Sequence, residues 1–278
     1  MAEAPHIPDQ RRQKMLRLLA RHDVLSVHQL TELLDVSHMT VRRDIAELER
    51  GGHAFTVPGG VRHARGVGLA PSFDAKSVID GPQKAAIAAE AASYVRDSGT
   101  YYLDAGTTTA ALLPAIRSAQ GVTVITNDFA IVAELMPDEH VQVVHVGGRL
   151  DHANRSSVGA LGALVLRQLA LDVAFVSATT WDLQRGLTSP DADKVDVKQA
   201  AMEVAATSVL LAASSKYGNY SVYRVAPLDR FDRVVTDDGL PSAAASGLAD
   251  AGVDVVLAAT EGVPAAVADT GSGATGTA

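Results

Sequence analysis

The sequence predicts an α/β protein in which a small helical head precedes a larger domain built on a mainly parallel sheet. Two observations support this. Two short helices joined by a tight turn lie near the N-terminus, and from residue 100 onward short apolar strands alternate with helices. Near-continuous apolar strands of this kind are typical of parallel sheets covered on both faces. With 278 residues, the chain is long enough for two domains with separate cores.

Composition is that of an ordinary globular protein and excludes several kinds of site. Apolar residues make up 47% of the chain and charged residues 20%. No apolar run reaches the roughly 18 residues of a membrane span, and the first residues lack the apolar core of a secretory signal. The absence of cysteine excludes disulfides, thiolate metal sites and cysteine nucleophiles. We therefore expect a cytoplasmic protein without membrane contact.

The net charge of −8 is unevenly distributed along the chain. Residues 1–66 carry ten Lys or Arg against eight Asp or Glu, whereas the remainder carries fourteen against twenty-four. A near-neutral to slightly basic head on an acidic body is consistent with a DNA-binding module that is fused to another domain.

Three helices are predicted in the head, at residues 11–21, 28–34 and 37–49. Ser26 and Ser37 are placed to cap the second and third helices, because a serine hydroxyl accepts a hydrogen bond from a free amide of the first turn. Two short helices joined by a three- or four-residue turn, the second of them cationic, form a helix-turn-helix pattern.

The third helix has one apolar face and one cationic end. Val41, Ile45 and Leu48 recur at helical spacing and predict a buried stripe. A helix that is exposed and cationic at its N-terminal end suits a DNA major groove. The alternative is a solvated helix face, but the helix-turn-helix context favours the DNA-binding interpretation. The candidate DNA-binding residues here are Ser37, His38, Met39, Thr40, Arg42 and Arg43.

A hairpin is predicted after this helix. Gly51–Gly52 ends the helix, Phe55 and Val57 alternate with polar neighbours, and Pro58–Gly60 predicts a turn. Such a hairpin is a wing that lies along the phosphate backbone of DNA, so Arg62 is a further candidate contact.

The remaining boundaries follow from composition. Residues 1–63 form the predicted winged helix-turn-helix domain, and residues 64–80, which lack periodicity, predict a linker. An α/β domain is expected over residues 81–259, and the small polar residues of 260–278 predict a disordered tail. Strands are expected near residues 101–103, 122–125, 141–146, 173–176, 209–212, 234–235 and 253–257.

Most of these strands end in a polar cluster, and parallel sheets bind ligands beyond the carboxyl ends of their strands. The clearest cluster is Asp104–Thr109, in which a glycine, three hydroxyls and a helix start follow a strand. Amides, hydroxyls and the helix dipole around one point favour an anion such as phosphate. No Gly-Lys pair follows, so this is not a nucleotide P-loop. A threonine-capped helix start without a ligand is the alternative.

Both halves of the chain resemble the DeoR family of bacterial transcriptional regulators. In the head, the resemblance is carried by Val36–Gly52 and by Gly59–Gly60. It implies a C-terminal domain that is related in fold to ribose-5-phosphate isomerase and senses phosphorylated sugars. In the body, it is carried by Asp104–Thr109, Thr126–Asn127, Gly147–Gly148, Ser157–Gly159, Gly186–Thr188 and Ser215–Lys216.

The resemblance also implies roles for particular residues. Gly106–Thr109 would hold the phosphate, whereas Asp104, Asn127 and Lys216 would face the sugar. The run Ala178–Trp181 is bulkier than the family's usual glycine-containing turn, and we expect it to reshape the pocket. The candidate effector-binding residues are Asp104, Gly106, Thr107, Thr108, Thr109, Asn127, Gly147, Gly148, Asp193, Lys198 and Lys216.

Other chemistries have less support. No two of the nine histidines stand with an acidic residue at the spacing of a helical zinc site, so no metal is predicted. Asp237–Asp238 suits either magnesium binding or the capping of a turn, and Gly239 with Pro241 favours the cap. The charged run Asp191–Lys198 predicts a solvated, partly paired surface that borders the pocket. No cofactor is expected.

Together these observations predict a DNA-binding transcriptional regulator of carbohydrate metabolism genes that is controlled by a phosphorylated sugar; repression is implied by the resemblance. A helix-turn-helix monomer reads few bases, so a homodimer or homotetramer is expected. The alternative is a sugar-phosphate isomerase-like enzyme with a DNA-binding head. Asp104 is then the one carboxylate of the best motif, and no second acid–base partner stands out. A regulator without ligand control is a third option.

Overall fold

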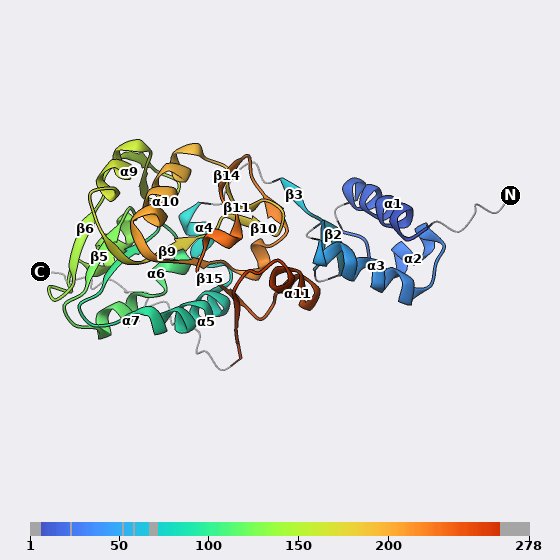
Figure 1. Ribbon diagram of the computed structural model, residues 1–278, viewed down its shortest axis with the longest axis horizontal. Coiled ribbons are helices and arrows are strands. Elements are labelled where there is room, and N and C mark those ends of the chain that lie inside the picture. The colour runs from blue at the N-terminus through green and yellow to red at the C-terminus, as the bar shows by residue number, and fades with distance from the viewer. Residues whose placement is uncertain (1–6, 23, 52, 58, 67–71, 262–278) are drawn as a thin grey trace, which may run out of the picture.

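The computed structural model describes residues 7–22, 24–51, 53–57, 59–66 and 72–261, with the head at one end of a larger α/β body (Figure 1). The predicted helices of the head and the wing are confirmed. None of the helices in these ranges is both long and apolar enough to cross a membrane. The elements of the head are α1 (Pro8–Arg21), α2 (Val27–Leu34), α3 (His38–Arg50), β1 (Ala54–Val57) and β2 (Gly60–His63).

The head has its own core and well-formed helix caps. At the start of α2, the Ser26 hydroxyl accepts from the amide of Gln29 at 3.1 Å, and the Gln29 side chain accepts from the Ser26 amide at 2.8 Å. This reciprocal pair satisfies two amides that the helix itself cannot pair. The predicted stripe of α3 is buried against α1 and α2. The core consists of Met15, Leu19, Leu25, Leu30, Leu34, Val41, Ile45, Leu48, Ala54 and Val61.

The body is built on a seven-stranded sheet in which every neighbouring pair is parallel, as the sequence predicts. The strand order across the sheet is β16-β15-β12-β9-β4-β5-β6. The seven strands are β4 (Thr100–Leu103), β5 (Thr123–Thr126), β6 (Gln142–His145), β9 (Leu171–Ser177), β12 (Ala205–Leu211), β15 (Arg233–Asp237) and β16 (Val255–Ala258).

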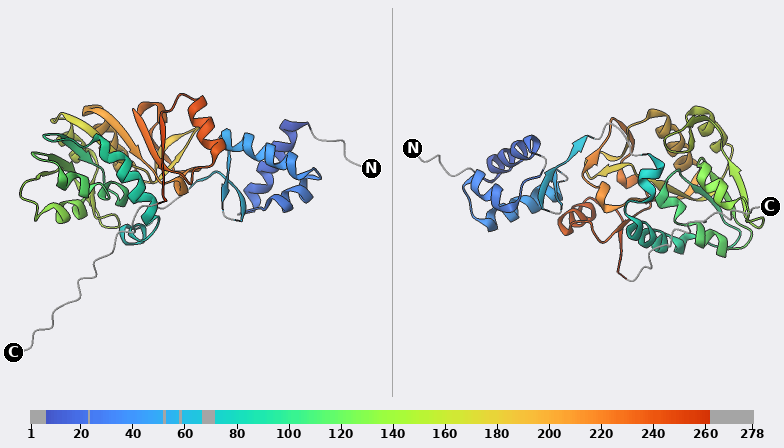
Figure 2. Two further views of the ribbon diagram at one scale, coloured as in Figure 1. Left: turned by 90° about the horizontal axis from the view of Figure 1, so that it is seen from below. Right: turned by 180° about the vertical axis from the view of Figure 1, so that it is seen from behind.

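Helices cover both faces of this sheet (Figure 2). Successive strand residues point to opposite faces, so Tyr101 and Leu103 join one core whereas Tyr102 joins the other. One face carries α5 (Gly81–Ala91), η1 (Ala92–Tyr94), α6 (Thr107–Ala110), α7 (Leu113–Ser118) and α8 (Phe129–Leu135). The other face carries α9 (Ala160–Leu166), α10 (Ala192–Val204) and α11 (Ser242–Asp250).

The order of the strands reverses between β4 and β9. From β4 the chain continues outward through β5 and β6, and it then returns to β9 on the other side of β4. At such a point the loops after the two strands turn in opposite directions and leave a crevice. Asp104 follows β4, and Ser177 ends β9, so both lie at this crevice.

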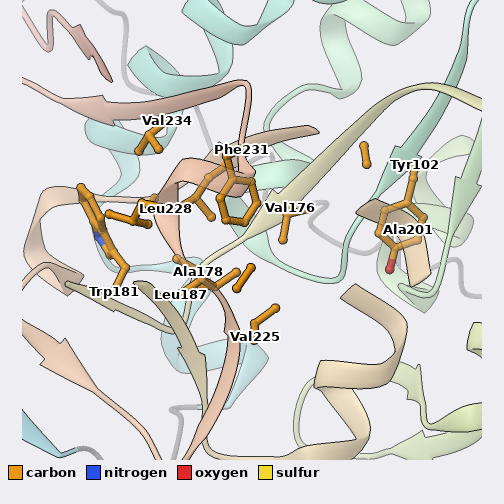
Figure 3. Packing of buried hydrophobic residues seen from close by; sticks show 14 of the residues in the cluster. Tyr102, Val176, Ala178, Trp181, Leu187, Ala201, Val225, Leu228, Phe231 and Val234 are labelled. Carbon is orange, nitrogen blue, oxygen red and sulfur yellow. The ribbon is translucent and has the colours of Figure 1, made fainter. Parts of the chain in front are cut away.

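Several features of the body were not predicted. A short antiparallel sheet of β10 (Thr180–Asp182), β11 (Gly186–Ser189) and β14 (Tyr223–Ala226) covers part of one face. Its Trp181 is fully buried beside Leu187 and Leu228 (Figure 3). Two short helices, α6 and α7, follow β4, where the sequence indicates a single helix start. The other additions are β7 (Arg149–Asp151), β8 (Ser156–Val158), η2 (Ser214–Lys216), β13 (Asn219–Tyr220) and η3 (Leu228–Arg230).

The predicted linker, residues 64–80, contains regular structure. It begins with β3 (Arg65–Gly66), which pairs in parallel with β13 of the body. Residues 67–71 lie outside the described ranges, and α4 (Phe73–Ser77) follows. The domain limits proposed from composition therefore stay predictions, and most of the predicted tail, residues 262–278, also falls outside the described residues.

The head packs on the body through the C-terminal end of α3. A Cβ atom at Gly247 of α11 would lie 2.3 Å from the carbonyl oxygen of Arg50, and one at Gly218 would lie 2.2 Å from the Phe55 ring. Gln184, in the turn between β10 and β11, donates to the carbonyl oxygen of Gly51 at 2.9 Å. Only glycine allows the two backbones to approach so closely.

Replacement of Gly247 with alanine is expected to weaken this docking by roughly 1–3 kcal/mol, because the added methyl group overlaps the Arg50 carbonyl. Hydrogen exchange of the β3 amides should then become faster, while the helices of the head stay protected. Ser246→Ala, on the exposed side of the same helix, is the matched control. Unchanged exchange at β3 in Gly247→Ala would contradict the interface.

Candidate functional site

Helix α3 presents its N-terminal half to solvent. The Ser37 hydroxyl accepts from the amide of Thr40 at 3.2 Å and so caps the helix, as predicted. The side chains of His38, Met39, Arg42 and Arg43 are exposed, and Met39 is 72% exposed, while the apolar stripe faces the core. An uncovered methionine between cationic side chains gives this end of the helix the character of a recognition surface.

A buried ion pair holds α3 against α1. Asp44 is 1% exposed, and its carboxylate accepts hydrogen bonds from the guanidinium of Arg11. Hydrogen bonding to this carboxylate raises the pKa of Arg11 above its usual value. The pair fixes the angle at which the exposed end of α3 leaves the head.

The wing is tied to the same helix. The carboxylate of Glu49 accepts from the amide of Thr56, which joins the end of α3 to β1. Arg62 of β2 lies with its guanidinium carbon 5.1 Å from the centre of the Phe55 ring. The Nε of Arg62 is buried and has no hydrogen-bond partner among the described residues. The predicted phosphate contact of Arg62 would therefore use its terminal nitrogens.

A pocket lies at the crevice between β4 and β9. Its walls come from the loops after β4, β5, β9 and β12, from α10 and from α4. Helix α4 belongs to residues 64–80, which we call the interdomain segment. Seven of the eleven predicted effector-binding residues line it: Asp104, Gly106, Thr107, Thr108, Asn127, Lys198 and Lys216. The structure thus brings together residues that are up to 112 positions apart in the sequence.

Asp104 is a structural centre of this pocket. It is 2% exposed, and its Oδ2 accepts from the Ser177 amide at 2.9 Å and from the Ser177 hydroxyl at 2.6 Å. The ammonium of Lys198, from α10, donates to the same oxygen. Burial lowers the pKa of Lys198, and the neighbouring Asp104 opposes this shift. These bonds join the ends of β4 and β9 to α10.

The loop after β5 supports the loop after β4. Asn127 accepts from the amide of Ala105 at 2.9 Å and from the Tyr102 hydroxyl at 2.9 Å, and it donates to the carbonyl oxygen of Ser157 at 2.8 Å. Asp128 accepts from the Gly106 amide at 3.0 Å, and burial raises the pKa of Asp128. The Gly106 amide, predicted to hold a phosphate, is therefore already bonded.

Four predicted residues do not reach the pocket. The hydroxyl of Thr109 is fully buried and donates to the carbonyl oxygens of Asp104 and Gly106. Asp193 points outward and pairs with Arg149, with 2.9 Å between Oδ2 and Nε. Gly147 and Gly148, after the outer strand β6, are not among the lining residues. Thr109, Gly147 and Gly148 were expected near strand ends and Asp193 was expected from the family resemblance, but neither argument shows which direction a side chain takes.

Lysine is concentrated at this pocket. The chain has six lysines, and four of them line the cavity: Lys76, Lys194, Lys198 and Lys216. A fifth, Lys84, lines an adjoining cavity that shares Lys76, Thr107, Thr179 and Lys216 with the first. A concentration of ammonium groups favours an anionic ligand. Sequence reasoning missed Lys76 and Lys194; the i, i+4 spacing of Lys194 and Lys198 is the signal that they share one face of α10.

Two of the four lysines that line the first cavity lack a carboxylate partner among the described residues. Lys194 pairs with Asp151 at 2.8 Å, and Lys198 pairs with Asp104, but no ion pair within the described ranges includes Lys76 or Lys216. Lys216 donates to the carbonyl oxygen of Ala178 at 2.7 Å. Burial, followed by the neighbouring Lys76, lowers the pKa of Lys216 to about 7. Burial, followed by Lys194, lowers the pKa of Lys76 to about 8.

A buried hydroxyl completes the pocket wall. Ser156 of β8 is fully buried and lines the cavity, and its Oγ has no hydrogen-bond partner in the part of the chain that the structure describes. A buried polar atom without a partner is costly unless a ligand or water satisfies it. The pocket therefore offers an unsatisfied hydroxyl beside unpaired ammonium groups.

The remaining acidic candidates serve the fold. Asp237 is 2% exposed and accepts from the Ser214 amide at 2.7 Å, from the Ser214 hydroxyl at 2.6 Å and from the Gly239 amide at 3.2 Å. This agrees with the turn-capping interpretation. Within the described residues, no group of three His, Asp or Glu side chains is placed to hold a metal ion. Of the bulky run after β9, Ala178 and Thr179 line the pocket, whereas Trp181 points into the core.

A winged helix-turn-helix head joined to an α/β body with a cationic pocket defines a ligand-responsive DNA-binding protein. The family model of the DeoR-like helix-turn-helix domain matches residues 11–65, and that of the DeoR C terminal sensor domain matches residues 80–238. The chain belongs to the DeoR family and is a DNA-binding transcriptional regulator with a small-molecule sensor domain.

Relatives of similar length support this assignment. The chain is 40% identical over 255 residues to YgbI of Escherichia coli K12, an uncharacterized HTH-type transcriptional regulator, and the match covers 92% of this chain and 100% of YgbI. A putative aga operon transcriptional repressor of Escherichia coli O157:H7 is 28% identical over 89% of this chain and 93% of its own. Ribose 5-phosphate isomerase A of Methanocaldococcus jannaschii matches half of this chain and 53% of its own, with 20% identity and a TM-score of 0.34.

Removal of one partner of the buried Asp104–Lys198 pair is expected to destabilise the body by about 3–5 kcal/mol, because the other charge is left buried and unpaired. Urea unfolding of Asp104→Ala and of Lys198→Met measures this cost. The double variant should lose less stability than the two single losses combined. Lys194→Met, which breaks a more exposed pair, is the control and should cost less. Additive losses in the double variant would contradict coupling between the two residues.

Proposed function

We propose that the protein represses genes of carbohydrate metabolism and that a phosphorylated sugar, bound in the lysine-lined pocket, controls its hold on operator DNA. The observation that carries the proposal is the pair of partly buried ammonium groups, Lys76 and Lys216, which line one cavity without a carboxylate partner among the described residues. A dianionic phosphate supplies the charge that the pocket lacks.

The rest of the pocket suits the polyol part of such a ligand. The orphan hydroxyl of Ser156 and the hydroxyls of Thr107 and Thr108 line the same cavity. Hydroxyl groups both donate and accept, so they can pair with sugar hydroxyls of either orientation. Asp104 and Asn127 also line the cavity, but most of their bonding atoms hold the loops, so their main contribution is the shape of the site.

The hydrogen bonds that Asp104 already accepts argue against its acting in proton transfer at a sugar carbon. A general base needs a free lone pair within reach of the substrate, whereas Asp104 accepts from the amide and the hydroxyl of Ser177 and from the ammonium of Lys198. We therefore propose a sensor without catalysis. Incubation with pentose and hexose phosphates checks this, and turnover that is lost in Asp104→Asn would overturn it.

The proposal also covers the direction of regulation, the oligomeric state and the location of the protein in the cell. The aga operon relative is named as a putative repressor, which favours repression here. Two recognition helices are needed to read a full operator, so we propose a homodimer or a homotetramer that binds half-sites one or more helical turns apart. Its operator target places the protein in the cytoplasm.

A thermal-melting screen tests the sensor role directly. The panel comprises ribose 5-phosphate, glucose 6-phosphate, fructose 6-phosphate and the corresponding unphosphorylated sugars. A ligand at a hundred times its Kd adds about 2.7 kcal/mol to the free energy of unfolding, so a cognate phosphate should raise the melting temperature and its parent sugar should not. No shift with any phosphate, while DNA binding persists, would support a regulator without ligand control.

Binding of the phosphate should weaken as pH rises from about 7 to 9. In the empty pocket the pKa values of Lys216 and Lys76 are about 7 and about 8, so both ammonium groups lose their protons in this window. Because the anion binds the protonated forms, its affinity should fall by up to about tenfold per pH unit for each proton taken up. Titration calorimetry at several pH values measures the fall. Lys216→Arg, which stays charged, should flatten the profile, and a flat wild-type profile would count against the proposal.

On the DNA side, Arg42→Ala should lower the affinity for operator DNA and flatten its salt dependence by about one unit of slope if this residue contacts a phosphate. Arg43→Ala is expected to act similarly, since both side chains are exposed on the same end of α3. Fluorescence anisotropy at several salt concentrations measures the slope. Arg167→Ala, at the residue that directly follows α9 of the body, is the control. An unchanged slope together with unchanged base preference would remove Arg42 from the interface.

A further inference from the structure

The interdomain segment is fastened to the pocket at both of its ends. At its beginning, β3 pairs with β13, which starts three residues after Lys216. At its end, Asp80 accepts a hydrogen bond from the hydroxyl of Ser215 at 2.6 Å, directly beside Lys216. The chain that leaves the head therefore contacts the pocket wall around η2 twice.

Between these two points, α4 is docked on the turn that joins β7 to β8. The amide of Phe73 donates to the carbonyl oxygen of Ala153 at 2.8 Å. Arg155 pairs with Asp74 at 2.8 Å, and its guanidinium lies 5.0 Å from the centre of the Phe73 ring. The ammonium of Lys84, from α5, donates to the carbonyl oxygen of Lys76 and so holds the end of α4.

One side chain of α4 enters the pocket. Lys76 lines both adjoining cavities, and its ammonium donates to the side-chain oxygen of Asn154. An ammonium has three donors, and among the described residues the side-chain oxygen of Asn154 is the one hydrogen-bond acceptor of the Lys76 ammonium. Lys216, which lines the same two cavities, likewise donates to the carbonyl oxygen of Ala178. Both groups thus retain donors that can meet an anion between them.

We infer that α4 of the interdomain segment forms part of the effector site and that Lys76 binds the anionic group of the effector together with Lys216. This rests on the proposed function and adds a route for its regulation. An anion held between the two lysines joins α4 to η2, and the chain leading to the head is attached to both. The bound effector therefore favours one position of this segment over others, which is the differential contact that control of DNA binding requires.

The test compares wild type with Lys76→Gln and Lys76→Arg. Glutamine keeps a donor for Asn154 but removes the charge, so the affinity for the sugar phosphate that stabilises wild type should fall about 10- to 100-fold, the size expected for a charge-assisted hydrogen bond. Arginine restores the charge and should recover most of this loss. Inorganic phosphate serves as a second probe, because it presents the anion without the sugar. Calorimetry measures both affinities.

Hydrogen exchange separates an effector contact from a merely structural role. In wild type, saturating sugar phosphate should slow exchange at the amides of α4 and β3. In Lys76→Gln, even a saturating concentration should leave α4 unprotected, while the loop after β4 is still protected. Arg155→Gln, which loosens α4 on its outer side and leaves every pocket lysine in place, is the matched control and should bind the ligand within about twofold of wild type.

The outcomes distinguish this inference from the proposed function. If no sugar phosphate and no inorganic phosphate binds wild type, the proposed function fails and the inference fails with it. If wild type binds, but Lys76→Gln binds equally well and shows the same protection of α4, the inference alone is overturned. Equal losses in Lys76→Gln, Lys76→Arg and Arg155→Gln would show that α4 acts through its docking and not through charge, which also overturns it.

Discussion

Two ammonium groups, those of Lys76 and Lys216, lie in one pocket at the switch point of a parallel sheet without a carboxylate to pair with them. Burial disfavours their charged forms, and the pKa values of about 8 and about 7 record that penalty. The pocket is therefore most stable either with deprotonated lysines or with an anion present. The effector binding that we propose for the body depends on this imbalance of charge.

The strand order explains why the imbalance arises here. The loops after β4 and β9 diverge, and the space between them is bridged by the Asp104–Lys198 pair and by the hydrogen bonds of Ser177. The charges of Asp104 and Lys198 neutralise each other, so Asp104 does not also pair with the neighbouring lysines that line the cavity. Asp104 and Lys198 thus form the framework of the site, and Lys76 and Lys216 supply its unsatisfied charge.

The head is tightly docked on the body close to this pocket, and this contact provides a physical link between the two. The close approach of Gly247 to Arg50 and of Gly218 to Phe55 places the end of α3 and the wing directly on the body. Gly218 lies two residues after Lys216, and the segment leaving the wing pairs with β13. A movement of η2 is therefore transmitted to the wing through a path of only a few residues.

Much of the fold could be predicted from local patterns. The caps of α2 and α3, the stripe of α3 and the seven strands follow from residue type and spacing, which act over one or two turns. The split of the helix after Thr109 and the burial of Trp181 could not be predicted, because they depend on packing against elements distant in the sequence.

Motifs in the sequence identified pocket residues such as Asp104 and Asn127, but they did not predict the direction in which the side chains point. Whether a side chain at a strand end points into a cavity or back into the loop depends on the neighbouring strand. Thr109 turns away from the pocket for this reason. Lys76 belongs to a segment without periodicity, and Ser156 to a short strand, so no pattern in the sequence could show that they line the pocket.

The central claim is that the pocket and the recognition helix are energetically linked. Fluorescence anisotropy of a DNA fragment, selected by the protein from a random pool, measures this link most directly when it is titrated with and without a bound sugar phosphate. The account predicts that the ligand changes the affinity for DNA by about 5- to 150-fold and that the DNA changes the affinity for the ligand by the same factor. Affinities for DNA and ligand that are independent of each other would contradict it.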